Sequence, residues 1–375
     1  MSLRKPEVIV MGSGPAAMLC ALAAARDKLR VHLFVLERNR FDARDFRSVE
    51  AVPAGLMALL IEFGIVPSQM GIFASYSNRL LAWETEVPVA SACPPTVYLE
   101  RPALDRALFA QMLRYENIGI EPFAGHAPSW DGLSWKLGNL EATYFIDATG
   151  RRAFSAQRRI APAMRWFACV WEFAPRSSNR ASSPLAIASL SGGYVYRIAS
   201  PALITLGAVG PRLGKVRRFD DLRAILEDSR AGWIASGLSA PSHGEGSCMS
   251  SNVQWSSDDD CASRNLIRIG DASLAREPLA SQGISIALSD ALYAIAAINN
   301  HQLRMLQRRQ AEQRARHLDS LRSIIARGRH RGSPDWDEYH KWIAGHTMTI
   351  ETQLGLRNGR LEFNSHDPHN TQALS

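Results

Sequence analysis

The stretch Glu7-Val-Ile-Val-Met11, followed directly by Gly12-Ser-Gly-Pro-Ala-Ala17, decides the fold of this chain. Its first half is a short apolar run, which is typical of a buried parallel strand. The glycines predict a tight turn into a helix over 18–26, and Pro15 suits the first helical turn, where its missing N–H costs nothing. A second apolar strand is expected over 31–36. The sequence therefore predicts a strand–turn–helix–strand unit within about 30 residues.

The turn between the first strand and the helix has the glycine spacing of a dinucleotide site. Gly12 permits the tight turn, Gly14 lets the backbone approach a pyrophosphate, and the small Ala17 lets the helix pack on the sheet. The helix N-terminus supplies N–H donors for the phosphates. Glu37, at the end of the second strand, can accept hydrogen bonds from ribose hydroxyls. We therefore expect a dinucleotide here, and a strand–helix turn without a ligand is the alternative. The residues expected to bind it are Gly12, Ser13, Gly14, Pro15, Ala16 and Glu37.

A second strand–loop–helix motif lies far along the chain. A strand over 266–269 delivers Gly270 and Asp271, and the segment from Pro278 to Ile284 opens a long apolar helix. A carboxylate at that sheet edge can bind a polyol, and the positive end of a second helix can stabilise negative charge. Two helix N-termini that are distant in sequence suit one long ligand, FAD, with its pyrophosphate on the first and its flavin on the second. An ordinary loop before a helix is the alternative.

Composition and charge set only broad limits. The 375 residues are 46% hydrophobic and 21% charged, and 43 Lys and Arg against 36 Asp and Glu give a formal net charge of +7. The basic balance can favour an anionic ligand, but no nucleic-acid-binding module is recognisable. The five cysteines show no CxxC pair and no zinc spacing, which favours a reducing compartment and argues against a disulfide framework or a metal site. No secretory signal and no apolar run of about 18–20 residues is seen, so a cytoplasmic protein is expected.

From about residue 7 to about residue 300, the chain resembles the FAD-dependent enzymes with the p-hydroxybenzoate hydroxylase fold. This family groups aromatic hydroxylases, geranylgeranyl reductases and tryptophan halogenases. The resemblance implies that the N-terminal unit and the Gly-Asp segment wrap FAD. It also implies individual roles: Arg101 at the phosphates, Glu37 and Arg38 around the adenosine, Arg47 and Glu50 beside the isoalloxazine, Asp271 on the ribityl chain, and backbone amides at Gln282, Gly283 and Ile284 facing the flavin. For Arg47, Glu50 and Arg101, a solvated surface position is the alternative.

The resemblance implies an α/β fold with three parts. These are an FAD-binding Rossmann-like domain of the p-hydroxybenzoate hydroxylase type, an inserted antiparallel β-sheet domain for the substrate, and C-terminal helices. We expect the FAD-binding domain over 1–80, 98–156 and 262–300, the substrate domain over 81–97 and 157–261, and a helical extension with a loose tail over 301–375. A helix expected over 302–330 has an apolar face and a basic face. A solvated basic face is the favoured interpretation, and an acidic partner protein or an anionic membrane surface is the alternative.

Three segments resemble the halogenase branch of the family: Asp147-Ala-Thr-Gly-Arg151, Pro278-Leu-Ala-Ser-Gln-Gly-Ile284, and Val49-Glu-Ala-Val-Pro53, which is expected as part of a loop beside the isoalloxazine. The halogenating residues are nevertheless missing. Ser77 stands where halogenases carry a Lys, and Tyr194 and Tyr196 replace the two Trp of a halogenase motif. A short chain of this branch without the Lys also resembles the maturation enzymes that oxygenate a Trp in a partner protein to build tryptophylquinone cofactors.

The expected function is that of an FAD-dependent monooxygenase acting on an electron-rich aromatic group, either a small molecule or a Trp of a partner protein. A flavin-dependent reductase or dehydrogenase of a prenyl or polyketide substrate is the alternative. A tryptophan halogenase is less favoured, and a flavin-bearing scaffold is a third class. Thr149 departs from the hydroxylases that take NADPH directly, which makes a separate flavin reductase a candidate electron donor. No residue stands out as a general acid or base.

Aromatic residues of the predicted substrate sheet form a candidate surface for substrate. Phe167, Trp171 and Phe173 fall on one face of a strand, and Tyr194 and Tyr196 share a face of another. Such a surface can stack an aromatic ring. Ordinary packing in the sheet core is the favoured alternative for each of them. The scattered histidines, His317 among them, are expected in surface or local hydrogen-bonding roles.

Overall fold

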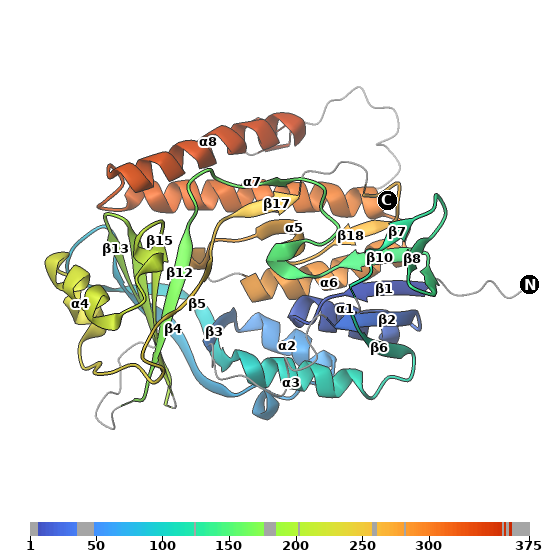
Figure 1. Ribbon diagram of the computed structural model, residues 1–375, viewed down its shortest axis with the longest axis horizontal. Helices are drawn as coiled ribbons and strands as arrows, with labels where there is room; N and C mark the ends of the chain where they lie inside the picture. The colour runs from blue at the N-terminus through green and yellow to red at the C-terminus, as the bar shows by residue number, and fades with distance from the viewer. Residues whose placement is uncertain are drawn as a thin grey trace, which may run out of the picture.

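The computed structural model describes residues 7–35, 49–123, 125–175, 185–201, 203–256, 261–280, 283–354, 356–357 and 360–361. Two β-sheets lie side by side, and helices cover both of them (Figure 1). In this described part of the chain, no helix is long and apolar enough to cross a membrane.

The first sheet has five parallel strands in the order β18-β10-β1-β2-β6. In that order their bounds are Leu266–Arg268, Tyr144–Asp147, Glu7–Met11, Arg30–Val35 and Ile118–Pro122. The apolar run from Val8 to Met11 is fully buried, as expected for a central parallel strand. Because the strands run in parallel, the ends of β1, β10 and β18 meet at one edge of the sheet. Gly12 and Asp271 follow at that edge.

Helices cover one face of the first sheet. They are α1 (Pro15–Arg26), α3 (Arg101–Met112) and α6 (Gly283–Asn299), with the short α2 (Gly55–Glu62) beside them (Figure 1). Helix α1 is flanked by α3 and α6, which explains why its Ala- and Leu-rich surface is buried nearly all round. The other face carries a small sheet of β7 (Ser129–Trp130), β8 (Trp135–Leu137) and β9 (Leu140–Ala142). There the ring of Trp135 packs on Phe145 at 5.0 Å between centroids.

The second sheet has eight strands in the order β16-β12-β15-β14-β13-β4-β5-β3. In that order their bounds are Ser247–Ser250, Phe167–Phe173, Ile204–Gly210, Gly193–Ala199, Leu185–Leu190, Ile72–Ala82, Val89–Glu100 and Val49–Pro53. The expected antiparallel pairing is confirmed for all neighbours except β13 and β4, which run parallel. Residues 49–53, expected as part of a loop, form the edge strand β3 because they pair with β5.

Different helices cover the two faces of the second sheet. Helix α4 (Phe219–Asp228) lies on one face, where Phe219 meets Phe173 edge to face at 4.8 Å. Helices α7 (Leu303–Arg327) and α8 (Pro334–Leu354) pack side by side over the other face and extend along one long edge of the molecule toward the first sheet (Figure 1). Helix α8 lies within the helical extension expected over 301–375, and its Trp336 and Tyr339 pack on Trp166 of the sheet core.

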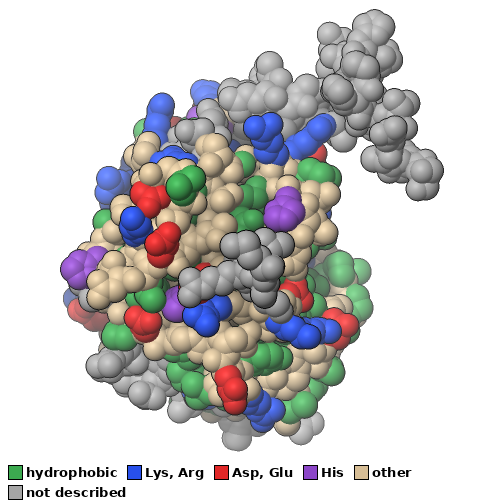
Figure 2. Space-filling view, turned by 90° about the vertical axis from the view of Figure 1, so that its right-hand side faces the viewer, with side chains coloured by type: hydrophobic (Ala, Val, Ile, Leu, Met, Phe, Trp, Pro, Cys, Tyr) green, Lys and Arg blue, Asp and Glu red, His purple; other side chains and the backbone are tan. Residues whose placement is uncertain are grey.

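Short elements complete the chain between these layers. Helix α5 (Asp271–Leu274) follows β18, and β11 (Arg159–Ile160) pairs with β17 (Gln254–Ser256) beside it. β19 (Leu356–Arg357) pairs with β20 (Arg360–Leu361). The 3-10 turns are η2 (Pro67–Gln69), η3 (Gly150–Arg152), η4 (Leu213–Lys215), η5 (Gly232–Ala235) and η6 (Pro278–Ala280). On the face shown in Figure 2, basic and acidic side chains are interspersed.

Candidate functional site

The glycine turn joins β1 to α1 in a conformation that only glycine adopts easily. Gly12 has φ +146°, and a Cβ on it would overlap the carbonyl oxygen of Ala148. Gly14 is the N-cap of α1 and Pro15 is its first helical residue, and among the described residues no side chain caps this end of the helix. The first turn also holds no acidic residue. The strand end therefore approaches Ala148 closely, and the first turn of α1 brings no acidic side chain of its own, an arrangement that suits a bound phosphate.

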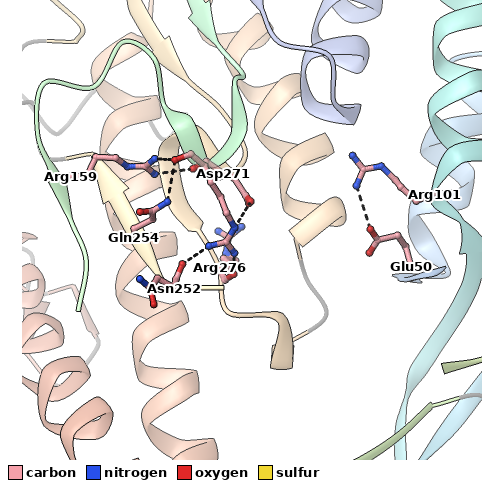
Figure 3. A network of polar contacts seen from close by, with 8 residues as sticks. Glu50, Arg101, Arg159, Asn252, Gln254, Asp271 and Arg276 are labelled. Atoms are coloured by element: carbon pink, nitrogen blue, oxygen red, sulfur yellow. Dashed lines mark hydrogen bonds and ion pairs between the residues drawn. The ribbon is translucent and has the colours of Figure 1, made fainter. Parts of the chain in front are cut away.

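Arg101 lies directly beside this turn. Its Nη2 is 3.8 Å from the point where a side chain on Gly14 would begin. Its Nε donates to Asp105 at 2.8 Å, and its Nη1 donates to Glu50 at 3.3 Å. These two carboxylates fix the guanidinium beside Gly14, the N-cap of α1, and Figure 3 shows the contact with Glu50. Arg101 thus lies beside the glycine turn, and its expected contact with the phosphates of a dinucleotide stays a prediction.

Glu50 lies on the edge strand β3 and faces the same region. Its side chain remains 32% exposed, yet desolvation raises its pKa and the ion pair with Arg101 only partly offsets that rise. The negative charges of Asp105 and Asp271 raise the pKa of Glu50 further. Glu50 and Asp271, which are far apart in sequence, therefore contribute to one electrostatic site.

Asp271 begins α5 at the end of β18, as the Gly-Asp motif predicts. The preceding Gly270 has φ +58°, and a Cβ on it would lie 3.3 Å from both Ala16 and Ala287. Gly270 therefore lets this strand end approach both α1 and α6. The carboxylate of Asp271 is 38% exposed and forms an ion pair with Arg151 at 3.5 Å. It is thus oriented but still open to a polyol ligand.

A polar network holds the segment around Asp271 (Figure 3). Arg151 donates to the carbonyl of Asn252 at 2.6 Å and to that of Arg276 at 2.8 Å. Gln254 donates to the carbonyl of Arg151 at 3.1 Å. Arg159 donates to the carbonyl oxygens of Arg151 and Asp271. The network joins the end of the first sheet to β17 and to the segment that leads into α6. It was not visible in the sequence because its members come from four separate segments.

The remaining expected cofactor residues fall into two groups. Gly283 begins α6, and a Cβ on it would meet nothing within 4 Å, so its backbone is accessible to a ligand. Ile284 is buried in the helix that follows. Four further expected residues lie outside the described part of the chain: Glu37, Arg38, Arg47 and Gln282.

A buried Glu–Tyr pair lies between the two sheets and was missed in the sequence. Tyr194 of β14 donates its hydroxyl to Oε1 of Glu277, and the Leu279 N–H donates to Oε2 at 2.7 Å. Burial raises the pKa of Glu277 to about 7, although these two hydrogen bonds and the charge of Arg151 oppose the rise. The only local sign of a buried carboxyl was a charged residue, Glu277, directly before Pro278 in a mostly apolar segment. Its partner is 83 residues away.

Two more tyrosines lie near this carboxylate. Burial raises the pKa of Tyr196 above its usual range, and the charges of both Glu50 and Glu277 add to the rise. Both carboxylates are therefore near enough to act electrostatically on the Tyr196 hydroxyl. Tyr339 of α8 is 1% exposed, and within the described residues its hydroxyl has no hydrogen-bond partner. Burial and the charge of Glu277 raise its pKa as well.

The aromatic residues expected to stack a substrate divide between the two faces of the second sheet. Trp171 and Phe173 pack against α4, on the face away from α7 and α8. Phe167 lies under the Lys215 ammonium at 4.8 Å. These three are ordinary packing residues. Tyr194 and Tyr196 instead face the side that contains Glu277.

One histidine differs from its expected role. His317 of α7 is 5% exposed, so it is not on the surface, and burial lowers its pKa to about 3. Within the described residues neither of its ring nitrogens has a hydrogen-bond partner. The same described residues contain no cluster of His, Cys, Asp or Glu that would hold a metal ion.

Comparison with known proteins rests on structure alone, since the chain matches no protein-family model and no curated protein sequence. The peptidyl tryptophan dihydroxylase QhpG, essential for tryptophylquinone cofactor biogenesis, superposes with a TM-score of 0.69 at 22% identity, over 89% of this chain and 78% of QhpG. A triple mutant of the flavin-dependent brominase Bmp2 gives a TM-score of 0.69 at 16% identity, over 93% of this chain and 98% of Bmp2.

A third similar structure is that of the myxobacterial chondrochloren halogenase CndH, described as a variant of FAD-dependent halogenases. It gives a TM-score of 0.66 at 17% identity, over 95% of this chain and 91% of CndH. These likenesses confirm the predicted α/β fold class. The chain has the fold shared by QhpG and the flavin-dependent halogenases.

Proposed function

We propose that this chain is an FAD-dependent monooxygenase that oxygenates an electron-rich aromatic group, with a Trp side chain of a partner protein as its substrate. The observation that carries the proposal is the placement of Arg101 beside Gly14 at the N-terminus of α1. A fixed cation, a close glycine backbone and an uncapped helix N-terminus together suit a pyrophosphate.

Different residues would hold the successive parts of FAD, from its pyrophosphate to its flavin. Gly12 to Ala16 and Arg101 would bind the pyrophosphate, and Asp271 would accept hydrogen bonds from the ribityl chain. The open backbone at Gly283 would face the flavin. We also propose that the five-stranded sheet with α1, α3 and α6 carries the cofactor and that the eight-stranded sheet covers the substrate. In this division β3 and most of β4, which lie within the 1–80 expected for the FAD-binding domain, contribute to the substrate side.

When bound, FAD supplies the redox chemistry and the activation of oxygen. The chain must exclude water, orient the aromatic ring and take up the proton that a ring carbon releases when oxygen is added. Glu277 and Tyr194 form the buried group best suited to hold that proton, because a carboxyl with a pKa of about 7 exchanges protons near neutral pH. Tyr196, which shares its face of the sheet with Tyr194, is the aromatic residue that we assign to the substrate side.

Two observations favour oxygenation of a Trp in a protein over halogenation. The fold is shared with QhpG, a peptidyl tryptophan dihydroxylase. The fold is also shared with halogenases, but Ser77 of β4 replaces the Lys that the halogenase resemblance requires. The proposal therefore places oxygen, not a halogen, on the ring.

The test is incorporation of labelled oxygen. The chain is reconstituted with FAD, reduced by a separate NADH-dependent flavin reductase, and exposed to ¹⁸O₂ with chloride present and a Trp-containing peptide as the probe. We expect a peptide that is heavier by labelled oxygen and contains no chlorine. A chlorinated peptide would identify a halogenase. Reduction of a prenylated probe, with no label in any product, would identify the reductase alternative.

A further inference from the structure

Two cysteines face each other on neighbouring strands of the second sheet. Cys169 of β12 is directly opposite Cys248 of β16 in the antiparallel register. Their Sγ atoms are 2.7 Å apart, which is closer than van der Waals contact of two sulfur atoms. Directly opposed residues in antiparallel strands have Cα separations of about 4.5–5.5 Å, and disulfides span about 4.4–6.8 Å. The backbone is therefore already placed for a covalent bond between them.

The surroundings hold the two sulfur atoms together. A Cβ on Gly246, just before β16, would overlap both Cys169 Sγ and the Trp171 ring, so glycine there lets the chain close over Cys169. Trp171 is in turn fixed by a hydrogen bond from its Nε1 to the carbonyl of Arg217 at 3.0 Å. This packing leaves the sulfur of Cys248 next to that of Cys169.

The two thiols differ in how easily an oxidant can reach them. Cys169 is fully buried, whereas Cys248 is half-buried on the edge strand of the sheet. Burial raises the pKa of Cys169, and its hydrogen bond with Cys248 adds to the rise. Cys169 therefore keeps its proton until the second step, and Cys248 is the sulfur that a small oxidant meets first.

We propose that Cys169 and Cys248 are an oxidation site that reacts with a peroxide to form a cross-strand disulfide. In the first step the Cys248 sulfur attacks a peroxide oxygen, the O–O bond breaks, and water leaves after proton transfer. In the second step the Cys169 sulfur attacks the Cys248 sulfur, the S–S bond forms, and a second water leaves. The two thiols lose two electrons and two protons in total, and hydrogen peroxide is reduced to two waters.

The cross-link would fix the edge of the substrate sheet. It joins residues 79 positions apart, so it would restrict the unfolded chain over a long loop. It would also attach the exposed edge strand β16 covalently to β12, its neighbour among the described strands. The sequence argued against a disulfide framework because the five cysteines are widely spaced. A single pair that the β12–β16 register brings together is compatible with wide spacing along the chain. The spacing alone could not reveal this pair.

The test is peptide mapping of the full chain without reduction. The protein is treated with hydrogen peroxide or with a phosphine reductant, free thiols are alkylated, and the digests are compared. We expect one cross-linked peptide pair containing Cys169 and Cys248 after peroxide, and alkylation of both residues after reduction. Alkylation of both residues after peroxide treatment, or a cross-link between other cysteines, would overturn the proposal.

Variants extend the test to stability. Cys93 is also half-buried and lies on β5 of the same sheet, so Cys93→Ser is the matched control and should keep the cross-link. Cys248→Ser should abolish it. The peroxide-treated wild type should melt at least about 3 °C above the reduced protein, and Cys248→Ser should show no such difference. A peroxide-dependent rise that persists in Cys248→Ser would contradict the assignment. If this variant fails to fold, the wild-type peptide map still decides.

Discussion

The hydroxyl of Tyr194 donates a hydrogen bond to Oε1 of Glu277, and this bond joins the substrate sheet to the turn before α6. Both residues are buried. The second oxygen of Glu277 accepts the Leu279 N–H at 2.7 Å, inside the segment that leads into α6. One carboxyl thus fixes the position of β14 relative to the helix start that we propose faces the flavin. The protonation state of Glu277 should therefore influence both the stability of the fold and the binding of the cofactor.

Glu277 should make stability depend on pH between about 4.5 and about 7. Burial raises its pKa from 4.5 to about 7 on folding, so the folded chain binds the proton more tightly. This stabilisation is fully present below pH 4.5 and is lost as pH rises through 7, with a total effect of about 3 kcal/mol. Glu277→Gln should flatten the pH dependence of the free energy of unfolding, measured by urea denaturation, across this window. Glu338→Gln, at an exposed site on α8, is the control and should leave the slope unchanged.

Loss of the Tyr194 hydroxyl should destabilise the chain. Tyr194→Phe leaves a buried carboxylate oxygen without its donor, which costs about 1–3 kcal/mol. In a Glu277→Gln background the cost should be smaller by about 1 kcal/mol, because the two residues interact directly. Urea denaturation of both single variants and the double variant at pH 8 measures this coupling. Strictly additive effects would show that the hydrogen bond contributes no coupling energy.

Arg101 should be required for tight FAD binding. Arg101→Ala removes the cation beside Gly14 and should weaken FAD binding by about 10- to 150-fold, the range for a charge-assisted hydrogen bond of 1.5–3 kcal/mol. Arg106→Ala is the matched control, because Arg106 is on the same helix but exposed. Fluorescence titration of the apoprotein with FAD measures both. Equal affinities for the two variants would exclude a phosphate role for Arg101.

Gly12→Ala should lower both stability and FAD content. The added Cβ would overlap the Ala148 carbonyl, and the residue would keep a φ of +146° that alanine avoids. We expect a loss of about 2–4 kcal/mol in unfolding free energy and little bound flavin. Gly345→Ala in α8 has open space around its Cβ and should be neutral or slightly stabilising. A Gly12→Ala protein that melts and binds FAD like the wild type would show that the turn relaxes easily.

The sequence predicted the parts of the fold that are encoded locally. The β1–α1–β2 unit and the Gly270-Asp271 strand end depend on short-range patterns of glycine and apolar residues, and both are confirmed in the structure. The proximity of Arg101 to Gly14 also agrees with the family resemblance. Helix α8 lies inside the helical extension expected over 301–375, but its bounds were not predicted because its apolar positions are dispersed among polar and aromatic residues.

The rest of the site depends on contacts that no local pattern records. Tyr194 meets Glu277, and Cys169 meets Cys248, only because sheet order and register bring distant segments together. The alternation along each strand predicted which aromatic residues share a face of the sheet. The sequence did not indicate which of the two faces α4 would cover. Trp171 therefore looked as suitable for a substrate as Tyr196 did.

The most direct test of the central claim is a titration of the purified full-length apoprotein with FAD, followed by flavin fluorescence and by the visible spectrum. Binding of one FAD per chain, with saturable changes in both signals and weaker binding by Arg101→Ala, is the result that our account predicts. A folded wild-type chain that shows no saturable binding and leaves the spectrum of free FAD unchanged would contradict the cofactor assignment and the proposed oxygenation together.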